Sequence, residues 1–126
     1  MNKNLYIGIL GGSFDPPHEG HVNISKAALT KMKLNEIWWI VTSSNPFKIK
    51  SSLFSKRYKQ TKDYVSNKNI RIIQLDEKKS AFTIDTVLYL KKKYPKHNFI
   101  WLMGSDNLID LHKWKSWREI FYNIPI

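Results

Sequence analysis

The chain has 126 residues and carries 21 lysine and arginine residues against 10 aspartate and glutamate residues, a net charge of +11. A single domain with one hydrophobic core is usual at this length, so we expect one domain over residues 1–126. The sequence has no cysteine, which excludes disulfides and thiolate metal sites, and it has no apolar run long enough to span a bilayer. The N-terminus also lacks the apolar core of a signal peptide. These features favour a cytoplasmic protein that does not bind membranes.

The basic excess raises the question of a nucleic-acid partner. Nearly all of it is lysine, because Arg57, Arg71 and Arg118 are the only arginines. Specific nucleic-acid binders rely on arginine for bidentate contacts with bases and phosphates. We therefore expect no specific nucleic-acid partner, and a general attraction for anionic nucleotides instead.

Short apolar runs alternate with helix-like segments along the chain, which is typical of a parallel α/β sheet. The predicted strands are Leu5–Leu10, Ile37–Val41, Ile70–Leu75 and Phe99–Met103. The predicted helices are Gly20–Lys33, Leu53–Val65, Thr83–Lys93 and Ser116–Tyr122, and an extended segment is expected to begin at Ile124. Right-handed crossovers between such strands predict a Rossmann-like, doubly wound parallel sheet with helices on both faces.

The apolar residues of two predicted helices indicate which sides face the core. They are Val22, Ile24, Ala27, Ala28 and Leu29 in the first helix, and Ile84, Val87, Leu88 and Leu90 in the third. Trp38 and Trp39 lie within a predicted strand and are expected to be structural. No GxGxxG fingerprint follows the first strand, which disfavours a plain NAD-binding domain.

The segment after the first strand, GGSFDPPHEGH, carries the most chemical information. Gly11 and Gly12 leave room for backbone amides to approach a phosphate. The helix expected from Gly20 directs its free N–H groups toward the same place. His18 and His21 are three residues apart, so both imidazoles can project toward that anion and stabilise developing charge. Two other interpretations remain open: a pair of metal ligands, for which no third ligand is evident nearby, or polar surface residues at a helix start.

This segment resembles the GxFDPxHxGH signature of the HIGH-type nucleotidyltransferases. The resemblance implies that His18 and His21 contact the phosphates of ATP, with the ATP side completed by Gly11, Gly12, Ser13, Phe14, Gly104 and Asp106. It also implies in-line attack of a substrate phosphate on the α-phosphorus of ATP, with no covalent enzyme intermediate. Mg²⁺ is expected as the cofactor, bound through the ATP phosphates. Catalysis would then consist mainly of positioning and charge stabilisation.

Three further segments narrow the resemblance to the nicotinate-nucleotide adenylyltransferases. They are NPFK at 45–48, FTIDT at 82–86, and MGSDN at 103–107 with the tryptophan at 114. The resemblance implies that the pyridine nucleotide is bound by Asp15, Lys48, Thr83, Asp85 and Trp114. Taken alone, Lys48 is as easily a solvated lysine, Thr83 or Asp85 a helix cap, and Trp114 or Trp117 part of a core.

The resemblance also ranks the substrates. ATP and nicotinate mononucleotide are the expected partners, giving deamido-NAD and pyrophosphate, and nicotinamide mononucleotide is the alternative acceptor. Phosphopantetheine adenylyltransferases carry threonine where this chain has His18. Cytidylyltransferases for glycerol phosphate or choline phosphate share both histidines but lack the NPxK and FTxDT segments.

The family's C-terminal ISSTxIR segment has no counterpart in the 126 residues, which indicates a chain truncated relative to the family. Losing charge-assisted phosphate contacts predicts weak ATP binding with the histidines retained. A catalytically impaired nucleotide-binding fragment is therefore the alternative to an active transferase. A missing edge strand would leave one flank of the sheet open, so a homo-oligomer is also expected.

Overall fold

The computed structural model describes residues 4–12, 19–41, 51–74, 83–103, 111–113 and 115–125. Its strands are β1 Tyr6–Gly12, β2 Glu36–Val41, β3 Ile70–Gln74 and β4 Asn98–Leu102. Its helices are α1 Glu19–Lys31, α2 Ser51–Tyr64, α3 Thr83–Lys93, the short 3₁₀ helix η1 Leu111–Lys113, and α5 Trp117–Asn123. Strands and helices therefore alternate through α3 and β4, as the apolar pattern predicted.

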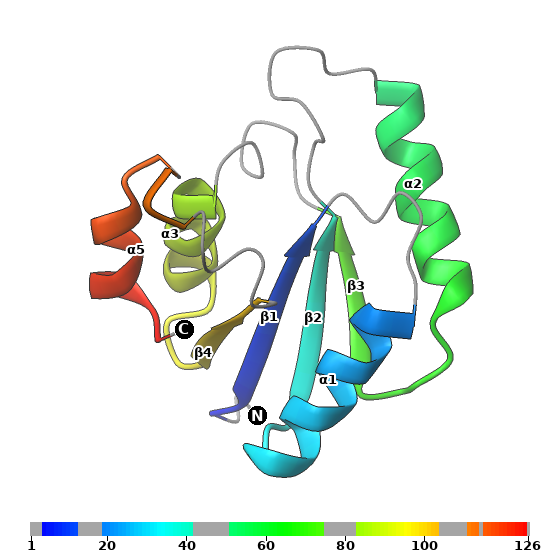
Figure 1. The fold of residues 1–126 in the computed structure, drawn as a ribbon, viewed down its shortest axis with the longest axis horizontal. Helices are drawn as coiled ribbons and strands as arrows, with labels where there is room; N and C mark the ends of the chain where they lie inside the picture. The colour runs from blue at the N-terminus through cyan, green and yellow to red at the C-terminus, as the bar shows by residue number, and fades with distance from the viewer. Residues whose placement is uncertain are drawn as a thin grey trace.

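The four strands form one parallel sheet in the order β3-β2-β1-β4 (Figure 1). In its centre Ile9 of β1 is level with Trp38 of β2 and with Trp101 of β4. The chain first adds strands on one side of β1 and then returns to add β4 on the other. This reversal defines a doubly wound sheet, so the predicted Rossmann-like fold is confirmed.

Two apolar cores lie on opposite faces of this sheet, since neighbouring residues of a strand point to opposite sides. One core joins alternate strand residues to α3 and α5; it contains Ile7, Ile9, Trp38, Ile40, Ile84, Val87, Leu90, Phe99, Trp101, Ile120 and Ile124. The other joins the remaining strand residues to α1 and α2; it contains Leu10, Ala28, Leu34, Ile37, Trp39, Val41 and Ile70. Helices therefore cover both faces, as expected.

The burial of the helices corrects two details of the sequence analysis. Ala27 of α1 and Leu88 of α3 were expected to face the core, but both are exposed, Leu88 by 46%. On α3 the buried arc is centred on Val87 and Leu90, and Leu88 lies more than a quarter turn away from it. Thr86, a polar residue on the buried side of α3, is fully buried, whereas the apolar Leu88 is not.

Glycine at position 8 is required by the packing of β1 against its neighbours. A Cβ atom there would lie 2.8 Å from Cδ1 of Ile37 and 3.0 Å from Cδ1 of both Leu102 and Leu34. These three methyl groups fill the space that a side chain would need. Gly8 thus allows the α1 face of the core to close over the centre of the sheet.

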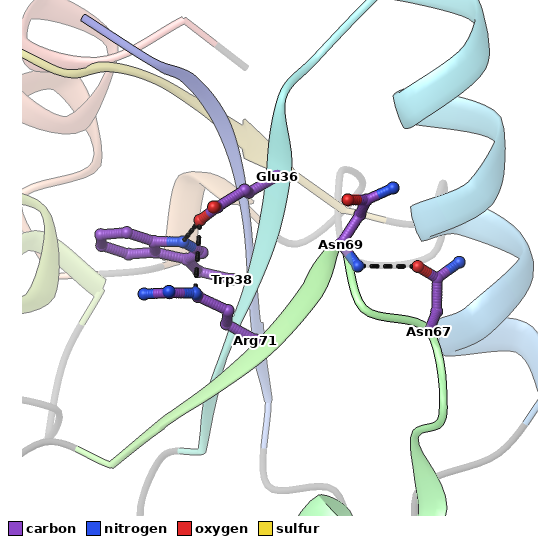
Figure 2. Close-up of polar contacts among 5 residues, drawn as sticks. All are labelled: Glu36, Trp38, Asn67, Asn69 and Arg71. Atoms are coloured by element: carbon purple, nitrogen blue, oxygen red, sulfur yellow. Dashed lines mark hydrogen bonds and ion pairs between the residues drawn. The ribbon is translucent and has the colours of Figure 1, made fainter. Parts of the chain in front are cut away.

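Polar contacts organise the start of strands β2 and β3 (Figure 2). The indole N–H of Trp38 donates to Oε1 of Glu36 at 2.8 Å, and Nε of Arg71 lies 3.6 Å from the same oxygen. Just before β3, the backbone N–H of Asn69 donates to Oδ1 of Asn67 at 2.8 Å, an asparagine turn that directs the chain into the strand. Of these contacts, the one between Arg71 and Glu36 joins the second residue of β3 to the first residue of β2.

The last described residues approach the outer edge of β4. After α5 the backbone of Ile124 is extended, with φ −155° and ψ 136°, and its side chain is buried. The backbone N–H of Trp101 donates to the carbonyl oxygen of Pro125 at 2.8 Å. The extended segment that was expected from Ile124 therefore lies beside β4, on the side away from β1. Among the described residues, no helix is long and apolar enough to cross a membrane.

Candidate functional site

The reversal of strand order lies between β1 and β4, where ligands of doubly wound sheets bind. Leu10 of β1 is in register with Leu102, the last residue of β4, and β1 continues beside β2 for two more residues to Gly12. The segments that leave these two ends, 13–18 and 104–110, are the ones from which chemistry was expected. The described strand ends place their starting points, Gly12 and Met103, at the same edge of the sheet.

The helix after β1 begins at Glu19, so His21 lies in its first turn as predicted. The His21 side chain is half-buried, and its ring centroid is 5.6 Å from that of Trp39, with the two planes tilted by 59°. His21 therefore rests on the sheet face that α1 covers. His18 and the preceding Ser13, Phe14 and Asp15 lie outside the described residues.

A chain of hydrogen bonds ties the backbone of His21 to the same tryptophan. The indole N–H of Trp39 donates to Oγ of Ser25 at 2.8 Å, and Oγ of Ser25 donates to the carbonyl oxygen of His21 at 2.9 Å. Ser25 and Trp39 are both fully buried. A buried indole N–H and a buried hydroxyl are costly unless each has a partner, and this chain satisfies both.

A second contact holds the start of α1 to the end of α2. The phenolic O–H of Tyr64 donates to Oε1 of Glu19 at 3.1 Å. Partial loss of hydration, the hydrogen bond to Glu19 and the negative charge of Glu19 together raise the pKa of Tyr64 above its ordinary value of 10.0. A shallow groove of about 360 Å³ adjoins this pair, lined also by Val22, Lys26 and Asn67.

Gly11 and Gly12 lie at the end of β1, as expected, and the packing gives a reason for the first of them. A Cβ atom on Gly11 would lie 3.0 Å from Cζ2 and Cη2 of the Trp101 ring. The Trp101 side chain is buried, so its rigid ring has little room to yield. Gly11 is therefore needed for packing, whether or not its amide meets a phosphate.

The first turn of α3 contains Thr83 and Asp85, both half-buried. The helix runs antiparallel to the strands, because it returns the chain to the start of the parallel strand β4 (Figure 1). Its first turn is therefore at the carboxyl edge of the sheet, and the Asp85 carboxylate stands where the helix dipole favours negative charge. This end of α3 belongs to the face opposite the one on which His21 rests.

The remaining predicted site residues, Lys48, Gly104, Asp106 and Trp114, lie outside the described residues. Trp117, for which core packing was the alternative, is half-buried, and the Arg118 guanidinium carbon lies 4.9 Å from the centroid of its ring. Within the part of the chain that is described, no three histidine, aspartate or glutamate side chains gather as metal ligands would.

Sequence reasoning missed Ser25, Tyr64 and Glu19. Ser25 had a local signal, because a serine four residues after His21 in a helix can donate to that residue's carbonyl. Tyr64 and Glu19 are 45 residues apart, and Trp39 is 14 residues from Ser25. No local pattern indicates such long-range pairs.

Comparison with known proteins assigns this fold and motif to a family. The model of the Cytidylyltransferase-like family matches residues 9–126. A protein of Ruegeria sp. (strain TM1040), named probable nicotinate-nucleotide adenylyltransferase, is 43% identical over 97% of this chain and 66% of its own length. Proteins of the same name from Erythrobacter litoralis and Agrobacterium fabrum are 39% and 38% identical, over 59% and 67% of their lengths. The chain therefore belongs to the cytidylyltransferase-like family, and its curated relatives there are named nicotinate-nucleotide adenylyltransferases.

Solved structures share the fold at lower identity. A Vibrio parahaemolyticus protein superposes with a TM-score of 0.76 at 16% identity, over 96% of this chain and 71% of that protein. A nicotinic acid mononucleotide adenylyltransferase of Plasmodium falciparum, complexed with NaAD, gives 0.73 at 21% identity, over 93% of this chain and 60% of that one. This chain spans 59% to 67% of the length of these curated relatives.

Proposed function

We propose that the protein transfers an adenylyl group from ATP to nicotinate mononucleotide, giving deamido-NAD and pyrophosphate. One observation carries the proposal. His21, a half-buried histidine of the GGSFDPPHEGH segment, lies in the first turn of α1. The strand β1 leads into that segment, and the strand order of the sheet reverses beside β1. The names of the relatives support the same reaction, and NaAD, the ligand in the Plasmodium falciparum structure, is the product it would give.

The reaction requires positioning and charge stabilisation rather than a covalent intermediate. A phosphate oxygen of nicotinate mononucleotide attacks the α-phosphorus of ATP, a new P–O bond forms, and the bond to the bridging oxygen of pyrophosphate breaks. In this proposal His18 and His21 donate hydrogen bonds to the phosphate oxygens, whose negative charge grows in the transition state. Gly11, Gly12, Ser13, Phe14, Gly104 and Asp106 surround ATP.

A second set of residues is proposed to bind the pyridine nucleotide. Asp15, Lys48, Thr83, Asp85 and Trp114 are its proposed contacts. The position of Thr83 and Asp85 supports this, because the first turn of α3 lies at the carboxyl edge of the sheet. Mg²⁺ would arrive with ATP as part of that substrate, held by its phosphates.

The first test is product formation by the purified protein. ATP, Mg²⁺ and nicotinate mononucleotide are incubated with the protein, and deamido-NAD and pyrophosphate are measured by chromatography. We expect both products in equal amounts. Removing one hydrogen-bond donor to a transition-state charge typically costs about a hundredfold to a thousandfold in rate, so His18→Ala and His21→Ala should each lose activity on this scale.

A matched control and two further measurements sharpen the test. His97 lies at the amino edge of the sheet, where its Nδ1 accepts the backbone N–H of Leu5 at 3.3 Å, so His97→Asn should keep the activity. Replacing the acceptor by nicotinamide mononucleotide tests the alternative substrate. Wild-type rates in His18→Ala would contradict the proposed mechanism. ATP binding without product would identify a nucleotide-binding protein that is not a transferase.

A further inference from the structure

The contacts around the first turn of α1 converge on one residue of the central sheet. Trp39 lies in the middle of β2, hydrogen-bonded between β1 and β3, where it is level with Leu10 and Ile72. Its side chain is fully buried. The indole therefore has a position set by three strands, while α1 is a separate element that must be held against it.

We propose that Trp39 and Ser25 are positioning residues that set the orientation of His21 for catalysis. The Trp39 ring supports the His21 ring at 5.6 Å, and the Ser25 hydroxyl links the Trp39 N–H to the His21 backbone carbonyl. One tryptophan thus restrains His21 twice, at its side chain and at its backbone. This inference rests on the proposed function, in which His21 contacts the phosphates of ATP.

The direction of the hydrogen bonds explains why serine suits position 25. Its hydroxyl has one proton, which it donates to the His21 carbonyl, and its lone pairs accept the indole N–H. Alanine at position 25 would remove the hydroxyl that accepts the buried Trp39 N–H. It would also remove the side-chain donor to the His21 carbonyl oxygen. Phenylalanine at 39 would keep a ring beside His21 and remove only the N–H.

Errors of position near a reacting phosphate are costly, since a displacement of about 1 Å can reduce the rate by about a hundredfold. Ser25→Ala and Trp39→Phe should therefore each lower kcat by about tenfold to a hundredfold. Their KM values should stay within about twofold, because neither side chain is assigned a contact with substrate. The double variant should resemble Ser25→Ala alone, since both residues act through one chain of hydrogen bonds.

Trp38 provides a matched control from the same strand. It is also buried, and its indole N–H also donates to a side-chain oxygen, that of Glu36, at 2.8 Å (Figure 2). It points to the opposite face, toward Tyr94 and Phe99. Trp38→Phe should therefore reduce stability to a similar degree and leave kcat unchanged.

The decisive experiment combines kinetics with proton NMR of the His21 imidazole, assigned by comparison with His21→Gln. The ring-proton signals of His21 should shift in Ser25→Ala, which leaves the Trp39 ring in place beside His21, and should stay in place in Trp38→Phe. Unchanged kcat in both site variants, or an equal loss in Trp38→Phe, would overturn the inference. If the wild-type protein forms no product, the proposed function fails. The NMR signals then decide alone, and a His21 signal that does not change in Ser25→Ala overturns the positioning role.

Discussion

The phenol of Tyr64 joins the last residue of α2 to the first residue of α1, and its titration gives the contact a pH signature. Its pKa is raised above the ordinary 10.0 by reduced hydration, by the hydrogen bond to Glu19 and by the charge of that carboxylate. A raised pKa means that folding favours the protonated phenol. The stabilisation is therefore complete below the unfolded pKa and is lost as the pH rises through the folded pKa.

We expect the difference in unfolding free energy between wild type and Tyr64→Phe to shrink as the pH rises above about 10. Urea unfolding followed by circular dichroism at each pH measures it. Glu19→Gln keeps a hydrogen-bond acceptor and removes the charge, so it should lower the pKa of Tyr64 and move this loss to lower pH. A difference that does not depend on pH would show that the contact does not exist in solution.

At the scale of elements, the end of α1 contains a strained residue. Lys33, two positions after the last residue of the helix, has φ 53°. Residues with a Cβ atom pay about 1–2 kcal/mol in this left-handed region, which is why glycine commonly follows a helix. Lys33 is exposed, so its side chain is not needed for packing.

Lys33→Gly should therefore stabilise the protein by about 0.5–1 kcal/mol, once the greater flexibility of glycine in the unfolded chain is subtracted. The shift of the urea midpoint measures this change. Lys26 is an exposed lysine in the middle of the same helix, and Lys26→Gly should cost about 1 kcal/mol. Equal effects of the two substitutions would contradict the argument.

For the whole molecule, the two cores share one sheet. Trp38 and Trp39 are adjacent residues of β2, yet they belong to opposite cores. Neither face can pack until the strands are paired, and each core buries one side of the same strands. The described parts of the chain should therefore unfold together.

We expect urea unfolding followed by near-ultraviolet circular dichroism, which reports the tryptophans, to coincide with unfolding followed in the far ultraviolet. The near-ultraviolet signal that Trp39→Phe removes belongs to the α1 and α2 face, and the signal that Trp38→Phe removes belongs to the opposite face, where Trp101 also lies. All curves should share one midpoint within each variant. Separate transitions for the two faces would refute the single domain expected from the sequence.

Much of this arrangement was predictable from the sequence because the signals are local. Each predicted strand and helix is present within one or two residues of its expected bounds, since hydrophobic period and turn residues act over short distances. The carboxyl ends of β1 and β4 were expected to flank the site, and their register confirms that they adjoin. The residues proposed to bind substrates come from motif resemblance, and they stay predictions.

The sequence by itself determined the order of the elements, the doubly wound class and the place of His21 in the first turn of a helix. Only the tertiary structure decided which residues of each helix are buried; on α3, for example, Thr86 is buried and Leu88 is exposed. It alone brought Trp39 to His21 and Tyr64 to Glu19. The reason is that local pattern fixes the period of an element, whereas its rotation and its distant contacts depend on how all the elements pack at once.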